Sequence, residues 1–170
     1  MSTKMNKLVL LSALMIAIIG TFGTVSAEET VDLIASNGNG QGIDVGNVTV
    51  TNNATHIFVE FTTIEGWLLN ETHLHIANES EEGIPQTKKG NPKVGQFDNS
   101  EEHEPCVDGY TYVIPLNELS GEVYIAAHAA VDGTVDGTTT YESAWGEGDE
   151  FNEGKNWAMY FTYTIPSTTQ

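Results

Sequence analysis

Residues 56–77, HIFVEFTTIEGWLLNETHLHIA, decide the fold class of this chain. Between His56 and Thr63, apolar side chains recur at every second position, the pattern of a half-buried β-strand: Ile57, Val59 and Phe61. Glu65-Gly66 marks a turn, and Trp67–Ala77 has the character of a second, longer strand. Two strands separated by so short a turn predict a β-hairpin.

Strands of the same kind are predicted along the rest of the chain, over residues 45–50, 110–116, 122–131, 140–145 and 157–165. About seven short strands with turn signals between them predict an all-β domain, a single antiparallel β-sandwich of the immunoglobulin-like or jelly-roll type. A jelly-roll or Greek-key barrel is the nearest alternative. Residues 78–108 break the alternation with proline, glycine and scattered charges, and they are predicted to form a long irregular loop.

The first 27 residues have the composition of a secretory signal peptide. Lys4 and Lys7 precede the apolar run 8–19, and Val25-Ser26-Ala27 supplies the small residues of a cleavage site before Glu28. Residues 28–170 are therefore expected to form one secreted domain that works outside the cell or at its surface. The apolar run is short for a membrane span, and no stable span is expected in the mature chain.

The charge of the chain limits its partners. All 24 acidic residues follow the predicted cleavage site, whereas only four of the six basic residues do, which gives a mature charge of 4 − 24 = −20. A surface of this sign repels nucleic acid and anionic lipid, so neither is expected to bind. A soluble extracellular or salt-adapted protein accounts for the acidity, and clustered carboxylates can also bind cations.

Three histidines form the sharpest candidate for a metal site. His73 and His75 share one face of a predicted strand, with Glu71 one step earlier, and His128 lies in the strand 122–131. If the two strands are neighbours, the three imidazoles can converge as ligands of one Zn or Cu ion. The alternative is that each histidine pairs with a carboxylate or a backbone carbonyl. His56 and His103 are isolated in the sequence and are expected at the surface.

Two acidic loops are candidates for a calcium site. Their carboxylates are spaced by glycines that permit tight curvature around Ca²⁺: Asp132, Asp136, Glu147, Asp149 and Glu150. Neither loop has the spacing of an EF-hand, and solvated hairpin loops are the alternative. A third candidate is a sugar-stacking platform of Tyr141, Trp145 and Trp157, against the alternative that the tryptophans belong to the core.

The chain carries no recognisable catalytic motif, neither a Gly-x-Ser-x-Gly elbow nor a His-Glu-x-x-His helix. Cys106 is the only cysteine, so no internal disulfide can form, and a passive surface thiol is expected. The sequence therefore favours a non-enzymatic secreted or cell-surface domain with a structural, adhesive or ligand-binding role, whose partner is a cell-envelope protein or glycan. The alternative is a His-ligated Zn or Cu metalloprotein, including a metalloenzyme.

Five stretches between residues 70 and 160 resemble an uncharacterised family of small secreted acidic β-domains found in archaea, notably methanogens, and in some bacteria. These stretches are Glu71–His75, Ile84–Pro92, Ala126–Ala129, Ala144–Gly148 and Asn156–Phe161. The resemblance implies a secreted β-domain and no particular reaction. It places His75, His128, Trp145 and Trp157 within the recurring runs of that family.

Overall fold

The computed structural model describes residues 27–36, 42–135 and 137–166. The predicted signal peptide therefore lies outside the described residues, apart from Ala27. The described chain forms ten strands: β1 (Glu28–Ser36), β2 (Gly42–Asn52), β3 (His56–Thr63), β4 (Trp67–Asn78), β5 (Asn99–Val107), β6 (Gly109–Pro115), β7 (Gly121–Val135), β8 (Thr138–Gly146), β9 (Asp149–Asn152) and β10 (Asn156–Ile165). Two single-turn 3₁₀ helices, η1 (Glu81–Gly83) and η2 (Val94–Gln96), lie between β4 and β5. No helix in the described residues is both long and apolar enough to cross a membrane.

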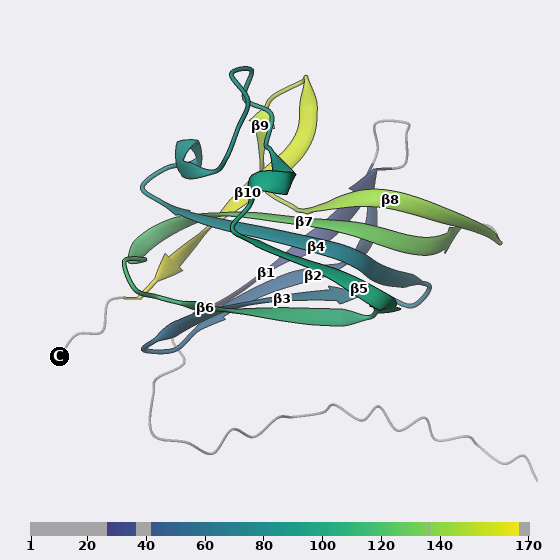
Figure 1. Cartoon of the computed structure of the whole chain (residues 1–170), viewed down its shortest axis with the longest axis horizontal. Helices are drawn as coiled ribbons and strands as arrows, with labels where there is room; N and C mark the ends of the chain where they lie inside the picture. Colours follow the sequence, from purple (N-terminus) through teal and green to yellow (C-terminus); the bar gives the residue numbers. More distant parts are fainter. Residues whose placement is uncertain (1–26, 37–41, 136, 167–170) are drawn as a thin grey trace, which may run out of the picture.

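All strand pairs are antiparallel, which confirms the predicted all-β antiparallel class. The strands form one continuous sheet in the order β5-β4-β7-β8-β1-β2-β3-β6, and β10 pairs with β7 and β9. This sheet curls until it is nearly closed into a barrel (Figure 1). One half, β5-β4-β7-β8, lies above the other half, β1-β2-β3-β6, and the β1–β8 pairing joins them.

The main core fills the space between the two halves because alternate residues of each strand point inward. β3 contributes Ile57, Val59 and Phe61, all fully buried, and β4 and β7 contribute Leu74 and Ile125 from the opposite side. Burying such side chains contributes about 1.5–3 kcal/mol each. Apolar residues therefore recur at every second position of the sequence because only one face of each strand contacts the core.

The predicted hairpin of residues 56–63 and 67–77 is wrong. β3 pairs with β2 and β6, whereas β4 pairs with β5 and β7. The short connection Ile64–Gly66 carries the chain from one half of the sheet to the other, and the Ile64 N–H donates to the Val45 carbonyl across the way at 3.0 Å. Both strands supply residues to the main core, β3 from the lower half of the sheet and β4 from the upper half.

The irregular segment is shorter than predicted. It occupies residues 79–98, because Asn99–Val107 forms β5, an edge strand paired with β4 alone. β5 combines exposed Glu101, Glu102 and Glu104 with Pro105, features that protect a sheet edge from pairing with other chains and disguise it as a loop in the sequence. The acidic loop predicted after Trp145 likewise contains the short strand β9.

A second, smaller core covers part of the outer face of the upper half. The 79–98 segment and the β9–β10 hairpin rise above β4, β7 and β8 (Figure 1). They bury Ile84, Phe97 and Ala158 against Ala77, Ala126 and Trp145 of the sheet. One end of the outer face is therefore covered by the second core, and the other end is not.

Gly46 on β2 lies where the lower half of the sheet is tightly packed. It follows a β-bulge at which Leu33 pairs with Gly46 and Ile34 with Asp44. A Cβ at position 46 would collide with the Thr62 carbonyl oxygen and lie 2.8 Å from Thr63 Cα, both backbone atoms that cannot rotate away. We expect Gly46→Ala to lower the free energy of unfolding by about 2–3 kcal/mol, measured by urea denaturation.

Gly95→Ala is the matched control, since a Cβ there meets no heavy atom within 4 Å. It should unfold within about 1 kcal/mol of the unaltered protein. Equal stability of Gly46→Ala and Gly95→Ala would contradict the described packing of β2 against β3.

Candidate functional site on the outer face of the sheet

The pairing of β4 with β7 brings the three predicted histidines to one face. His73 lies directly opposite His128, and His75 lies opposite Ala126 two residues further along. Their neighbours Leu74 and Ala127 pair on the inner face and belong to the main core. His73, His75 and His128, called the histidine row below, therefore occupy the outer face between the second core and the open end of the sheet.

Each histidine of the row has a polar neighbour. His73 Nε2 lies 2.8 Å from Glu71 Oε1, and His128 Nε2 lies 2.8 Å from Ser143 Oγ on β8. His75 Nδ1 is 3.3 Å from Asp98 Oδ2, but the two atoms are not aligned for a hydrogen bond. The rings of His73 and His128 are 5.5 Å apart between centroids, and His128 also packs on Trp145 at 4.8 Å.

The surroundings of His128 favour its neutral form. Burial of the imidazole, and secondarily the neighbouring His73, lower the pKa of His128 from 6.5 to about 3. Part of the residue reaches the surface, but its Nδ1 atom has no contact with solvent. A protonated ring would place its positive charge against Trp145 with no carboxylate of the described chain facing it. The ring therefore stays uncharged at neutral pH.

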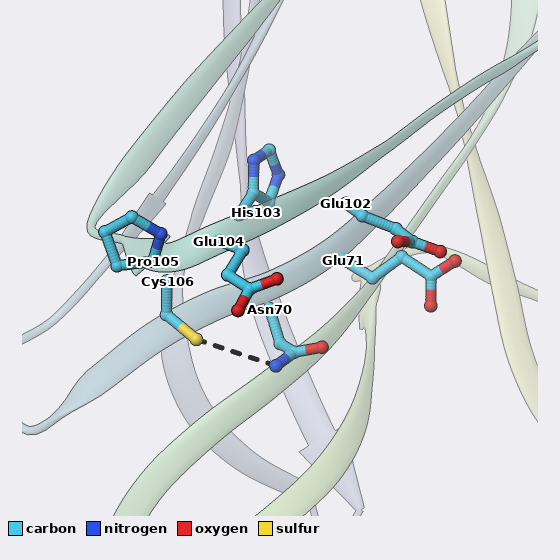
Figure 2. A pocket seen from close by; sticks show the side chains of 7 residues that line it. All are labelled: Asn70, Glu71, Glu102, His103, Glu104, Pro105 and Cys106. Carbon is cyan, nitrogen blue, oxygen red and sulfur yellow. Dashed lines mark hydrogen bonds between the residues drawn. The ribbon is translucent and has the colours of Figure 1, made fainter.

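A cleft of about 890 Å³ opens beside the histidine row at the outer edge of β4 and β5 (Figure 2). Its lining consists of Asn70, Glu71, Glu102, His103, Glu104, Pro105 and Cys106. The carboxylates of Glu71 and Glu102 lie next to each other because the two residues pair across β4 and β5. We call this feature the acidic cleft; no lysine or arginine lines it.

The floor of the acidic cleft is tied together by weak polar contacts. Asn70 Nδ2 lies 3.5 Å from Cys106 Sγ and 3.4 Å from Asp132 Oδ2, and the Cys106 thiol donates to the same Asp132 oxygen at 3.4 Å. Asp132 thus adds a carboxylate beside the lining residues. Cys106, for which a passive surface role is predicted, lies in the lining of the acidic cleft and contacts Asn70 and Asp132 there.

Sequence reasoning missed Glu102 and Glu104 as site residues because β5 was assigned to a loop. The alternation in residues 99–107 is the signal that could have found them, since Glu102, Glu104 and Cys106 recur at every second position. His103, which alternates with them, was predicted at the surface, and this was wrong. It is buried on the inner side, where its Nε2 lies 3.1 Å from Thr72 Oγ1, and burial lowers its pKa against the raising effect of Glu101.

The predicted calcium ligands are not gathered in one place. Asp132 lies opposite Tyr141 on β8, whereas Glu147, Asp149 and Glu150 follow the far end of that strand. Gly146 lies five positions after Tyr141 on β8, about 17 Å along the strand at 3.4 Å per residue. Asp136 lies outside the described residues. In the described part of the chain, no three or more histidine, cysteine or acidic side chains are arranged to hold a metal ion.

The three predicted aromatic ligands also separate. Trp145 is buried in the second core, and Trp157 packs partly buried against that core and lines a hollow of about 420 Å³ with Met159 and Ile34, whereas Tyr141 is 73% exposed on β8. They do not form a common stacking platform. His56, by contrast, lies on β3 away from the outer face, with its Nδ1 2.8 Å from Thr55 Oγ1.

Comparison with known proteins adds no relative: no family model, no curated protein and no solved structure matches the chain. The site must therefore be interpreted from its own chemistry. That chemistry is a row of uncharged or carboxylate-paired imidazoles next to a cleft of negative charge.

His128 provides a pH test of this arrangement. Its pKa is about 3 when folded and 6.5 when unfolded, so between these values the unfolded chain binds a proton that the folded chain does not. Stability is therefore complete above pH 6.5 and falls as the pH is lowered, by up to about 1.4 kcal/mol per pH unit from this group. We expect His128→Asn to remove this contribution, which would flatten the curve of unfolding free energy against pH between 6.5 and 3.

The carboxylates titrate in the same range, so the slope must be compared between variants. His56→Gln, which removes an imidazole outside the site, is the matched control for the loss of one histidine. Parallel curves for His128→Asn and the unaltered protein would show that His128 is not held neutral by the fold.

Proposed function

We propose that this chain is an exported binding domain that holds a positively charged organic ligand in the acidic cleft. The observation that carries the proposal is the lining of the cleft: three of its seven residues are glutamates, and none is a lysine or arginine. Adjacent carboxylates repel each other, and a cationic ligand placed between them relieves that repulsion.

The size of the cleft favours an organic cation over a bare ion. A space of about 890 Å³ lies in the range of small-molecule sites and far exceeds one metal ion. The lining offers the carboxylates of Glu71, Glu102 and Glu104 as acceptors for ammonium or guanidinium groups, with the Asn70 amide beside them. An amine-rich ligand such as a polyamine fits this chemistry.

Export and a non-enzymatic role belong to the same proposal. Residues 1–27 have the pattern of a signal peptide, and the remaining charge of −20 suits a soluble protein outside the cell. The resemblance to small secreted acidic β-domains points the same way. The curled sheet supports the predicted relation to sandwich and jelly-roll domains, whose two layers face each other across a core in the same manner.

Binding of spermine, followed by isothermal titration calorimetry, tests the proposal. We expect binding that weakens with added NaCl, because exposed charges are screened. The double variant Glu102→Gln/Glu104→Gln should weaken spermine binding by about 5- to 30-fold, since each exposed ion pair contributes roughly 0.5–1 kcal/mol.

The matched control is Glu82→Gln/Glu118→Gln, which removes the same charge from exposed positions outside the cleft. It should bind spermine almost as tightly as the unaltered protein. An equal loss of affinity in both double variants would show that spermine responds to total charge, and the proposed site would be abandoned.

A further inference from the structure

Three buried nitrogen atoms in the described chain lack hydrogen-bond partners. They are the only such side-chain atoms among the described residues, and all three are Nδ1 atoms of the histidine row: His73, His75 and His128. A buried polar atom without a partner costs about 1–3 kcal/mol, and folded proteins contain few of them. Their gathering on two paired strands points to a ligand for these nitrogens.

The other ring nitrogen of two of these histidines is already engaged. The Glu71 carboxylate can only accept, so His73 Nε2 carries the proton and its Nδ1 presents a lone pair. His128 Nε2 lies 2.8 Å from Ser143 Oγ, a hydroxyl that accepts the Nε2 proton in the tautomer whose Nδ1 carries the lone pair. Histidines that bind metals show this division, with one nitrogen on the metal and the other held by a carboxylate or another polar group.

The spacing of the two rings suits a shared ion. A metal lies about 2.0–2.1 Å from a ligating nitrogen and hence about 3.2 Å from the ring centre. Two imidazoles on one tetrahedral ion are then about 5 Å apart between centroids, and wider angles allow about 6 Å. The observed separation of His73 and His128 is 5.5 Å, with an interplanar angle of 45°.

We propose that His73 and His128 bind one Zn²⁺ or Cu²⁺ ion through their Nδ1 atoms, with Glu71 and Ser143 orienting the two rings. The site has two protein ligands, since no group of three or more histidine, cysteine or acidic side chains in the described residues could hold a metal ion. Water completes the coordination.

His75 is a bystander in this arrangement: its ring packs on Phe97 at 5.8 Å, and its Nδ1 faces Asp98. The proposal is independent of the acidic cleft, since it uses nitrogen ligands and not the glutamates of β5.

Cu²⁺ is the better probe, because it has the highest affinity for nitrogen sites among the divalent first-row metals. Electron paramagnetic resonance of the purified protein with one equivalent of Cu²⁺ should show hyperfine coupling to two imidazole nitrogens. The variants His73→Gln and His128→Gln should each lose the two-nitrogen signal, and Glu71→Gln should weaken Cu²⁺ binding by about 10- to 100-fold. His56→Gln, which removes an imidazole outside the row, should leave the spectrum unchanged.

The spectrum of the unaltered protein decides the question even where a variant does not fold. A signal with oxygen ligands alone would assign Cu²⁺ to the acidic surface and overturn the proposal. A two-nitrogen signal that persists in folded His73→Gln or His128→Gln would overturn it as well. Spermine binding is measured separately, so either proposal can fail without the other.

Discussion

The pairing of β4 with β7 is the constraint on which the rest of the structure depends. It runs from Trp67 opposite Gly133 to Asn78 opposite Val123, the most extensive ladder in the described sheet. Because side chains alternate between faces, this one register places Leu74 and Ala127 in the core and His73 and His128 outside. A slip of one residue would bury the imidazoles in the main core and expose the apolar residues.

The outer face shows how the same two strands support different chemistry along their length. At one end Ala77 and Ala126 are small enough for Ile84 and Phe97 to pack above them and form a dry second core. At the other end Glu71 and Asp132 are partly exposed to solvent beside β5. The histidine row lies at the boundary, where burial from one side keeps His128 neutral and Glu71 from the other side fixes the His73 ring.

Much of this architecture could be predicted from alternation. Residues 56–63 and 67–77 are strands as predicted, and the parity of 73, 75 and 128 predicted that the three histidines share one side of the sheet if their strands are neighbours, which they are. Strand order could not be predicted in the same way, because a connection as short as Ile64–Gly66 serves a hairpin or a crossing between the two halves of the sheet. β5 was missed because the residues that protect an edge, Glu102, Glu104 and Pro105, are also those typical of loops.

The most direct measurement of the central claim is disulfide trapping of the β4–β7 register. In a Cys106→Ser background, Glu71→Cys and Ala130→Cys place two thiols directly opposite each other on the outer face, at a distance that a disulfide can bridge. We expect rapid oxidation of this pair, and none for Glu71→Cys with Ala126→Cys, which the register separates by about 13 Å along the strand. Cross-linking of the second pair, or of neither, would contradict the register and with it the histidine row and the acidic cleft.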